Sequence, residues 1–387
     1  MTCSYTVATV DPPKIAFTID LHSNKNELNS QMKAACKQLL HGWDAFEDTE
    51  IEVSVISGGI SNALYKLTPP SSPSLSPIAL RIYGIGTDKF VDREKEVKTM
   101  QLLHLNGFGP AILGLFTNGR IESFLSMRCL TPDEMSSPNF SKHIATTLYK
   151  FHSVDAENRP ATAVTPFTRI YEWLDIAEKL DFSDDPKKLS AFQKFDFIEL
   201  KKEVEAVEAA AAPLKSPIVF AHNDLLSGNI MIPLENNSCE SSNKMDKMTF
   251  IDFEYSGWAP RGFDLGNHFC EYAGFECDYD KYPDRHIAGT FLRAYLTEEA
   301  ILLSQRKNSG HGTSVSDEAV AIAVAEANVY SLAAHQYWGI WALIQARWSK
   351  IDFDYMEYAG MRWGEYKRRK NEFLSEAKEA AALLLES

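Results

Sequence analysis

The segment FAHNDLLSGNIMI, residues 220–232, contains residue types at a spacing that could transfer a phosphoryl group. Four residues separate Asp224 from Asn229, and the apolar residues Ile-Met-Ile follow at once. In phosphoryl transfer, an Asp at this position aims the attacking hydroxyl and the Asn holds magnesium. A polar turn ahead of a strand can show the same pattern, so the interpretation depends on what else the chain supplies.

A second carboxylate for magnesium is expected at the end of the next strand, where the segment FIDFEYSG provides Asp252. Magnesium is a hard cation that binds carboxylate and amide oxygens and keeps several of its waters. Asp252 and Asn229 together offer such oxygens, although an Asp that closes a strand at a turn is also common. The order of loop, ribbon and apolar-Asp-Phe segment favours a phosphotransferase.

An early hairpin, SGGISN at 57–62, is the candidate for binding phosphate. Its two glycines let backbone N–H groups approach phosphate oxygens, and its serine and asparagine side chains add donors. A Gly-Gly hairpin can also be an ordinary turn. The candidate binding residues here are Ser57, Gly58, Gly59, Ser61 and Asn62.

A cation for the phosphates is expected on the third strand, where ALRIYG offers Arg81. Its partner should be a glutamate on the following helix, and both Glu94 and Glu96 are available. We favour Glu96, because it shares an inward helix face with Met100 and Leu103. The alternatives are an ordinary strand arginine and a solvated helix charge.

Composition limits the function classes. The 387 residues suffice for two lobes, since single cores stop growing near about 250–300 residues. The formal net charge of -14 argues against a nucleic-acid partner, which would need a basic footprint. It is compatible with a cationic substrate.

The cysteines and the apolar segments indicate a cytoplasmic protein. The six cysteines form no C-x-x-C pair, as expected for free thiols in a reducing compartment. The N-terminal residues lack the pattern of a secretory signal. The apolar region 321–348 is broken by polar residues, including Glu326 and His335, and predicts a buried helix or helix pair rather than a membrane span.

Hydrophobic periodicity and turn residues predict a β-rich first third and a mainly helical remainder. Strands are expected within 51–67 and at 78–84, 111–116 and 119–127, with a two-strand ribbon after Asn229. Helices are expected at 26–43, 92–107, 137–153, 195–212 and 321–348, the third starting with Ser-Pro capping chemistry. The pattern predicts an α+β, bilobal protein-kinase-like fold, with a small β-rich nucleotide-binding lobe at 1–130 and a larger, mainly α-helical catalytic lobe at 131–387.

The chain resembles the choline/ethanolamine kinase family, and most of all its ethanolamine kinases. The resemblance is carried by AHNDLLSGNIMI, FIDFEYSGWAPRGFDLGNHFCEYAGFECDYDKYPD and AAHQYWGIWALIQARWSKIDFDYMEYAG. It also includes SGGISNALYKL, LRIYG and GFGPAILGLFTNGRIESF, and extends over residues 45–370. It implies ATP-dependent phosphorylation of ethanolamine to phosphoethanolamine, the entry step to phosphatidylethanolamine synthesis.

The resemblance also implies catalytic roles. It makes Asp224 the catalytic base, and Asn229 and Asp252 the ligands of Mg²⁺. It places Arg81 on the phosphates of ATP.

The resemblance also implies which residues bind the adenine and which hold the catalytic loop in place. The adenine is expected against the backbone of ESFL, residues 122–125, between the lobes, which adds Ser123 and Leu125 to the nucleotide-binding residues. Asp264 resembles a structural aspartate that braces the catalytic loop through backbone N–H groups. His222 is expected to be a framework residue, because magnesium prefers oxygen ligands.

In the family the amine pocket lies in the C-terminal lobe. Carried over to this chain, the substrate-binding residues are Asp224, Glu271, Trp338, Trp341, Phe353 and Tyr358. On spacing alone the two tryptophans would be core residues of an apolar helix, and only the resemblance assigns them to the pocket.

The pocket favours ethanolamine over choline. A quaternary ammonium cannot donate hydrogen bonds and is bound by several aromatic faces, whereas a primary ammonium donates three and is bound by carboxylates or carbonyls. Choline kinases have a further aromatic shortly after the stretch matching HFCEY. Here Ala273 and Gly274 are small, and Glu276 stands near the place of that aromatic.

Three other functions stay open. The first is a choline kinase or a dual-specificity kinase, since Trp338 and Trp341 could bind choline. The second is an aminoglycoside-type phosphotransferase, which would not explain the segment YWGIWALIQA. The third is an inactive ATP-binding scaffold, which the complete set of Asp224, Asn229 and Asp252 argues against. A homodimer stays open as the assembly.

Overall fold

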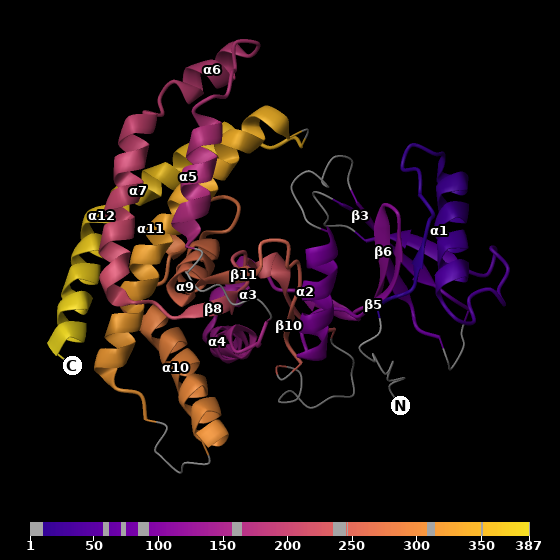
Figure 1. The fold of residues 1–387 in the computed structure, drawn as a ribbon, viewed down its shortest axis with the longest axis horizontal. Coiled ribbons are helices and arrows are strands. Elements are labelled where there is room, and N and C mark those ends of the chain that lie inside the picture. The colour runs from indigo at the N-terminus through magenta and orange to yellow at the C-terminus, as the bar shows by residue number, and fades with distance from the viewer. Residues whose placement is uncertain are drawn as a thin grey trace. The chain divides into compact units, whose positions relative to one another are not determined.

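The computed structural model describes residues 11–56, 62–70, 75–83, 93–156, 165–234, 245, 247–307, 314–349 and 351–386 (Figure 1). The chain divides into two compact units, Met1–Met127 and Arg128–Ser387.

A six-stranded sheet forms the centre of the first unit, in the order β1-β5-β6-β4-β3-β2. Its neighbouring strands pair antiparallel except for β1 and β5, which are parallel. Two helices accompany it, α1 (Lys25–Leu39) and α2 (Arg93–Leu105). The strands are β1 (Lys14–Ile15), β2 (Glu52–Val55), β3 (Asn62–Thr68), β4 (Ile78–Tyr83), β5 (Ile112–Phe116) and β6 (Gly119–Ser123).

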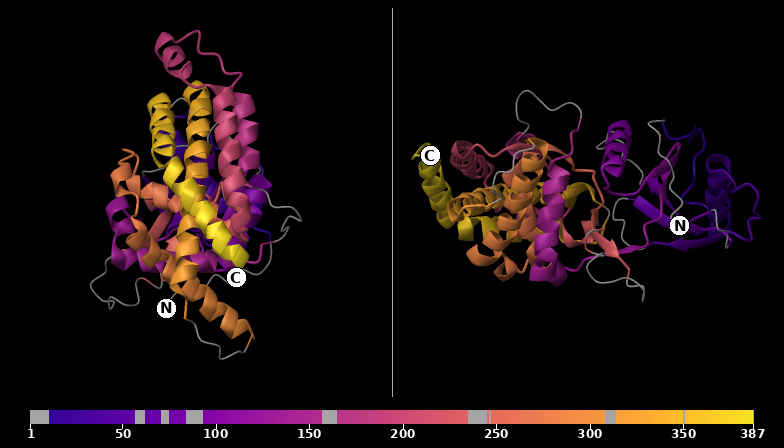
Figure 2. Two further views of the ribbon diagram at one scale, coloured as in Figure 1. Left: turned by 90° about the vertical axis from the view of Figure 1, so that its left-hand side faces the viewer. Right: turned by 90° about the horizontal axis from the view of Figure 1, so that it is seen from below.

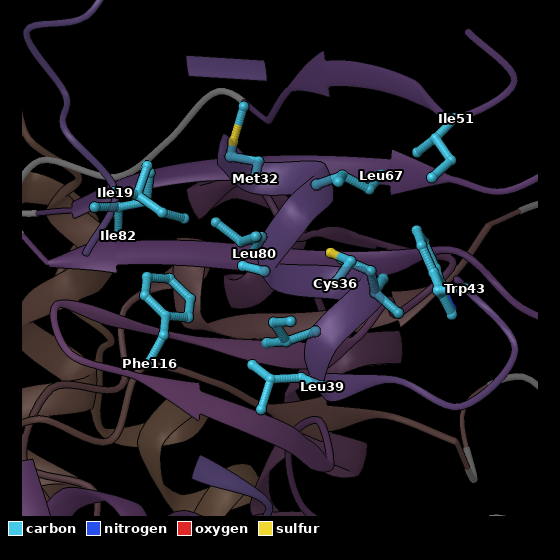
Figure 3. Close-up of a cluster of buried hydrophobic side chains, with 13 residues drawn as sticks. Ile19, Met32, Cys36, Leu39, Trp43, Ile51, Leu67, Leu80, Ile82 and Phe116 are labelled. Atoms are coloured by element: carbon cyan, nitrogen blue, oxygen red, sulfur yellow. The ribbon is translucent and has the colours of Figure 1, made fainter. Parts of the chain in front are cut away.

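Helix α1 packs on this sheet through one apolar face (Figure 3). Met32, Cys36 and Leu39 recur at helical spacing and are buried against sheet residues such as Leu80 and Phe116. Each large side chain that is fully buried contributes roughly 1.5–3 kcal/mol to folding. The sheet that carries Arg81 and Glu122 is therefore held rigidly from one side.

The second unit is built around α11 (Asp317–Trp348), which is buried along most of its length. Helices α5, α7, α9, α10 and α12 all pack against it (Figure 1, Figure 2). A helix that is apolar on all sides belongs in a core, as expected from the sequence. The other helices are α3 (Pro132–Ser136), α4 (Pro138–His152), α5 (Pro166–Ala177), α6 (Pro186–Phe192), α7 (Phe197–Ala211), α9 (Arg261–Cys270), α10 (Arg285–Lys307) and α12 (Tyr355–Glu386).

A glycine lets α9 approach α11 closely. A Cβ at Gly266 would lie 2.4 Å from the carbonyl oxygen of Ala327 and 2.5 Å from the backbone nitrogen of Ser331. Real side chains do not tolerate such distances, so only glycine fits here. The close packing fixes α9, which carries Asp264 and Asn267.

Two short sheets frame the loop that contains Asp224. Strand β8 (Ile218–Ala221) pairs antiparallel with β11 (Gly257–Pro260), and the other sheet has the order β10-β9-β7. Its strands are β7 (Met127–Cys129), β9 (Ile230–Pro233) and β10 (Thr249–Phe250). The loop leaves β8, passes through the 3₁₀ turn Ser227–Asn229 and enters β9.

The predicted fold class is confirmed, with a β-rich N-terminal unit and a larger helical C-terminal one. The pairing of β8 with β11 was missed, because both strands are short and β11 carries Trp and Pro rather than an alternating pattern. Ser137 is the N-cap residue of α4 and Pro138 follows in its first turn, as expected, but the Ser137 hydroxyl donates to the carbonyl of Glu134 and makes no capping hydrogen bond. Within the described ranges, no helix has the length and apolar character that crossing a membrane requires.

Candidate active site

The backbone of the loop at residues 222–229, which the sequence predicts to be the catalytic loop, is held by a buried carboxylate. Asp264 on α9 accepts hydrogen bonds from the backbone N–H groups of His222 at 2.6 Å and Asn223 at 2.7 Å. Asn223 has φ of +64°, which asparagine tolerates better than most residues, and its amide donates to the carbonyl of Tyr255. The bracing role predicted for Asp264 is confirmed.

Asp264 is itself kept ionised by its surroundings. Burial would raise its pKa, but a hydrogen bond of 2.9 Å from Nε2 of His152 and two backbone N–H donors hold the pKa below its usual value. The hydroxyl of Tyr295 lies 2.7 Å from Nδ1 of the same histidine. The charge that holds the loop is therefore permanent at neutral pH.

Asn229 is joined directly to Asp224. Its side-chain amide donates to the backbone carbonyl of Asp224 at 2.8 Å, and lies 3.4 Å from Oδ2 of that residue. With the NH₂ group used in this way, the amide oxygen stays available as a ligand. The backbone carbonyl of Asn229 accepts from the N–H of Ile251, which fixes the residue next to Asp252.

Asp224 lies in a cluster of carboxylates. Burial, followed by the charges of Glu271, Asp252 and Glu254, raises its pKa well above the ordinary value, and Arg362 acts in the opposite direction. Asp252 lies two residues beyond the end of β10, is exposed and has φ of +64°, a strained value for a residue other than glycine. A carboxyl whose proton affinity is raised by its neighbours is suited to accept a proton from a substrate hydroxyl.

The donor set near Asp224 fits magnesium. The carboxylate of Asp252 and the amide oxygen of Asn229 offer oxygen ligands, which Mg²⁺ prefers. Among the described residues no three His, Cys, Asp or Glu side chains gather closely enough to hold a metal by themselves. Mg²⁺ in phosphotransferases is held by one or two carboxylates together with water and the substrate phosphates, so the smaller set suffices.

His222 is a framework residue. Its Nε2 donates to the carbonyl of Ile251 at 3.0 Å, and burial lowers its pKa so that the ring is neutral. The hydrogen bond joins the start of the catalytic loop to the residue before Asp252.

The aromatic residues predicted for the amine pocket form one continuous cluster. The rings of Trp338 and Trp341 are 5.5 Å apart at 83°, and Trp341 is 5.7 Å from Tyr355. Phe353 lies 4.9 Å from Tyr355 and 5.6 Å from Tyr358. Tyr355, which sequence reasoning missed, links the tryptophans on α11 to the residues that begin α12.

Trp338 is also linked to the loop that contains Asp224, by way of Asn267. Its Nε1–H donates to Asn267 at 2.8 Å, and the amide of Asn267 donates to the backbone carbonyl of Asn223 at 3.2 Å. Tyr255 packs edge-on against Trp338 at 5.2 Å. Trp338 is buried, Trp341 is partly exposed and Phe353 is 38% exposed, so the cluster extends from the core to the surface.

Glu271 is joined to the aromatic cluster by an arginine that sequence reasoning missed. Arg362 donates through Nη2 to Glu271 at 2.6 Å and through Nε to the hydroxyl of Tyr358 at 2.8 Å. Glu276, which was expected to supply an acid, is exposed, whereas Glu271 is joined to Tyr358 through Arg362. Glu271 is therefore the carboxylate of this cluster.

The nucleotide-binding residues predicted in the first unit are only partly described. Ser57, Gly58, Gly59 and Ser61 lie outside the described residues, as does the side chain of Asn62, whose backbone begins β3.

The two residues predicted beside the adenine both make backbone contacts. Ser123 accepts from the N–H of Ala111 through its hydroxyl and donates its own N–H to the carbonyl of Ala111. The carbonyl of Leu125 accepts from Met127.

Glu96 points inward as predicted, but its expected partner is wrong. Its carboxylate pairs with Arg120 at 2.9 Å and with Arg93 at 2.7 Å, whereas Glu94 is exposed. Arg120 is on β6, in register with Arg81 of β4, and it is Arg120 that reaches Glu96 on α2.

Arg81 pairs with a different carboxylate. Its Nε lies 3.6 Å from Glu122, which also accepts from Arg120. Burial would raise the pKa of Glu122, but Arg120 and Arg81 hold it below its usual value. The first unit therefore contains a buried row of alternating charges, Arg81–Glu122–Arg120–Glu96, where the sequence predicted one pair.

The model of the family described as choline/ethanolamine kinase matches residues 53–367. The chain belongs to this family. The match covers the catalytic loop, the carboxylate cluster and the aromatic residues described above, so the family predicted from the sequence is confirmed.

Individual relatives support the assignment of this chain to the choline/ethanolamine kinase family. A protein named probable ethanolamine kinase from Arabidopsis thaliana is 35% identical over 92% of this chain and 90% of its own length. Probable choline kinase 2 from the same plant is 31% identical over 92% of this chain and 96% of its own length. The solved structure of an ethanolamine kinase from Plasmodium vivax superposes with a TM-score of 0.74 and 27% identity, over 93% of this chain and 94% of that one.

Proposed function

We propose that this protein transfers the γ-phosphoryl group of ATP to the hydroxyl of ethanolamine, producing phosphoethanolamine and ADP. The observation that carries the proposal is the position of Glu271. It belongs to the carboxylate cluster that raises the pKa of Asp224, and through Arg362 it is also joined to the aromatic cluster. A small molecule with a hydroxyl at one end and an ammonium at the other suits such a pair of neighbouring sites.

Each catalytic role is assigned to residues of this chain. Asp224 accepts the proton of the substrate hydroxyl as its oxygen attacks the γ-phosphorus and the bond to ADP breaks. Asn229 and Asp252 are the proposed ligands of Mg²⁺, which when bound neutralises charge on the phosphates. Arg81 and the hairpin 57–62 are the proposed phosphate-binding groups.

The remaining nucleotide and domain assignments belong to the same proposal. Ser123 and Leu125 are the proposed neighbours of the adenine. Residues 1–130 are proposed as the nucleotide-binding part, and residues 131–387 as the part that provides catalysis and amine binding. Glu96 supports the first part indirectly, through Arg120.

The amine end of the proposed site favours a primary ammonium. Glu271 offers a carboxylate oxygen to an N–H donor, and Trp338, Trp341, Phe353 and Tyr358 offer ring faces to the positive charge. A carboxylate close to aromatic rings binds ethanolamine through both its hydrogen bonds and its charge. Choline can use the charge alone.

The first experiment is an assay of ADP release from Mg-ATP with ethanolamine and, in parallel, with choline. We expect kcat/KM for ethanolamine to exceed that for choline by about tenfold or more, equal to about 1.4 kcal/mol in transition-state binding. Equal values, or a preference for choline, would assign the protein to choline or dual-specificity kinases. Turnover of neither amine would reject the proposal.

A choline or dual-specificity kinase is the second candidate. The observation that favours it is the perpendicular pair of Trp338 and Trp341 at 5.5 Å, since crossed aromatic faces also bind quaternary ammonium groups. A cytoplasmic location and assembly as a homodimer stay predictions. Fluorescence microscopy of a tagged chain and sedimentation of the purified protein test them.

A further inference from the structure

Arg362 occupies an unusual position on α12. The residue is 3% exposed, so its guanidinium is removed from water almost completely. It donates to Glu271 through Nη2 and to Tyr358 through Nε, and its guanidinium carbon lies 5.1 Å from the centre of the Tyr358 ring. One buried cation therefore holds two side chains that are both proposed to line the amine pocket.

Stability alone is a poor explanation for this arginine. Its Nη1 is buried without a hydrogen-bond partner among the described groups. A buried charged donor that lacks a partner costs free energy, and a well-packed apolar residue at the same position would avoid that cost. A residue kept in spite of such a cost is a candidate for a functional role.

We infer that Arg362 is the positioning residue of the amine pocket, and that it makes the pocket selective for ammonium groups that carry N–H bonds. The inference rests on the proposed function. Arg362 occupies Oε1 of Glu271 and so leaves Oε2 as the acceptor for the substrate. At the same time its Nε donates to the hydroxyl of Tyr358, which fixes the orientation of that ring.

The selectivity follows from the directional nature of hydrogen bonds. A free carboxylate attracts every cation through its charge, whether or not the cation can donate a hydrogen bond. A carboxylate whose charge is compensated by a guanidinium attracts a methylated ammonium less, but its fixed oxygen still accepts an N–H bond in a defined direction. Ethanolamine therefore depends on Arg362 more than choline does.

Arg362 has a second consequence for Asp224. Glu271, Asp252 and Glu254 all repel the charge of Asp224, and Arg362 is the cation that opposes them. The guanidinium thus supports the ionised form of the proposed base from the side of the amine pocket.

Replacement of Arg362 by methionine tests the inference. We expect KM for ethanolamine to rise by about tenfold or more, KM for ATP to stay within about twofold, and the ratio of kcat/KM for ethanolamine over choline to fall by about tenfold. Arg362→Lys keeps the charge but can reach only one of the two partners, and should recover part of the loss. Tyr358→Phe removes only the hydroxyl that accepts from Nε of Arg362. It should produce a smaller rise in KM for ethanolamine.

A matched control lies on the same helix. Arg369 pairs with the buried Glu365 at 3.2 Å, and with Glu372, in contacts that do not include the amine pocket. Arg369→Met removes a comparable ion pair from α12, so it should lower the unfolding midpoint without changing KM for either amine. Titration calorimetry with ethanolamine alone measures the binding step without catalysis.

The outcomes separate this inference from the proposed function. If the wild type phosphorylates neither amine, the proposed function fails and the inference falls with it. If the wild type prefers ethanolamine but Arg362→Met keeps that preference, or raises both KM values equally, only the role of Arg362 is rejected. Should Arg362→Met fail to fold, Arg362→Lys and Tyr358→Phe decide, and unchanged amine KM values in both would reject the role.

Discussion

Asp264 accepts the backbone N–H of Asn223 at 2.7 Å, and this contact fixes the residue that immediately precedes the proposed base. In Asp264→Asn, one of the two acceptor oxygens becomes an NH₂ group that faces an N–H donor. We expect the free energy of unfolding to fall by about 1–3 kcal/mol. We also expect kcat to fall by about tenfold to a hundredfold, because the loop that carries Asp224 shifts. Urea unfolding and steady-state kinetics measure the two effects.

Asp196→Asn is the control for Asp264→Asn. Asp196 also accepts two backbone N–H groups, from Ile198 and Glu199, but it does so as the exposed N-cap of α7. Asparagine caps helices as well as aspartate does, so this variant should change stability by only a few tenths of a kcal/mol. If both variants behaved alike, burial and position at the catalytic loop would not be what makes Asp264 important.

Asp224→Ala should separate activity from stability. The carboxylate is desolvated and repelled by Glu271, Asp252 and Glu254, so its removal relieves repulsion in the folded state. We expect turnover to fall by about 10²–10⁴-fold, the usual contribution of a general base. The unfolding midpoint should stay the same or rise, as is common when a strained functional group is removed. Near-normal turnover would remove Asp224 from its proposed role.

Asp252→Asn should change the dependence of the rate on magnesium. The substitution replaces a carboxylate by a neutral amide at an exposed position, directly after Ile251, whose N–H donates to the carbonyl of Asn229. We expect the Mg²⁺ concentration at half-maximal rate to increase by at least about tenfold, a loss that even outer partners of a metal can cause. A magnesium titration at fixed ATP measures this, with Asp196→Asn as the unaffected reference. Unchanged magnesium dependence would contradict the assignment.

Local spacing sufficed to propose the residues of the catalytic loop. Asp224, Asn229 and Asp252 are recognisable because the loop and the following strand are contiguous in the chain, so that sequence order fixes spatial order. Arg362 could not be found in this way, because its partner Glu271 lies 91 residues away and on a different helix. The same holds for Asn267, whose contacts depend on the close approach of α9 to α11.

The prediction that Glu96 pairs with Arg81 failed for a similar reason. The pair with Arg81 was predicted from an order of motifs, which does not say which of two adjacent strands lies nearer to α2. Arg81 and Arg120 are cross-strand neighbours on β4 and β6. The packing of the helix on the sheet decides between them, and this is a tertiary property.

A double-mutant cycle can measure which arginine forms the stabilising ion pair with Glu96. We expect a coupling of about 1–3 kcal/mol between Glu96→Gln and Arg120→Met in urea unfolding, because the two groups form a buried ion pair at 2.9 Å. The cycle with Arg81→Met should give less than about 0.5 kcal/mol. A larger coupling with Arg81 would restore the pair that the sequence predicted.

His268 should make stability depend on pH in the acid range. Its Nδ1–H donates to the carbonyl of Leu225 at 2.8 Å, and burial lowers its pKa to about 4 from the ordinary 6.5. Between these values the unfolded chain binds a proton that the folded chain does not, so the free energy of unfolding falls as the pH falls. The decrease in the free energy of unfolding due to His268 reaches about 3 kcal/mol by pH 4. Above pH 6.5 the stabilisation that comes from keeping His268 neutral is fully present.

The variant His268→Gln isolates this effect, since glutamine can donate to the same carbonyl but does not titrate. Its free energy of unfolding, measured in urea at a series of pH values, should fall less steeply than that of the wild type between pH 6.5 and pH 4. His286 is exposed on α10, and His286→Gln should follow the wild-type slope. Parallel slopes for wild type and His268→Gln would mean that His268 takes up its proton in the folded state as readily as in the unfolded chain. The contact with Leu225 would then hold a charged ring beside the catalytic loop.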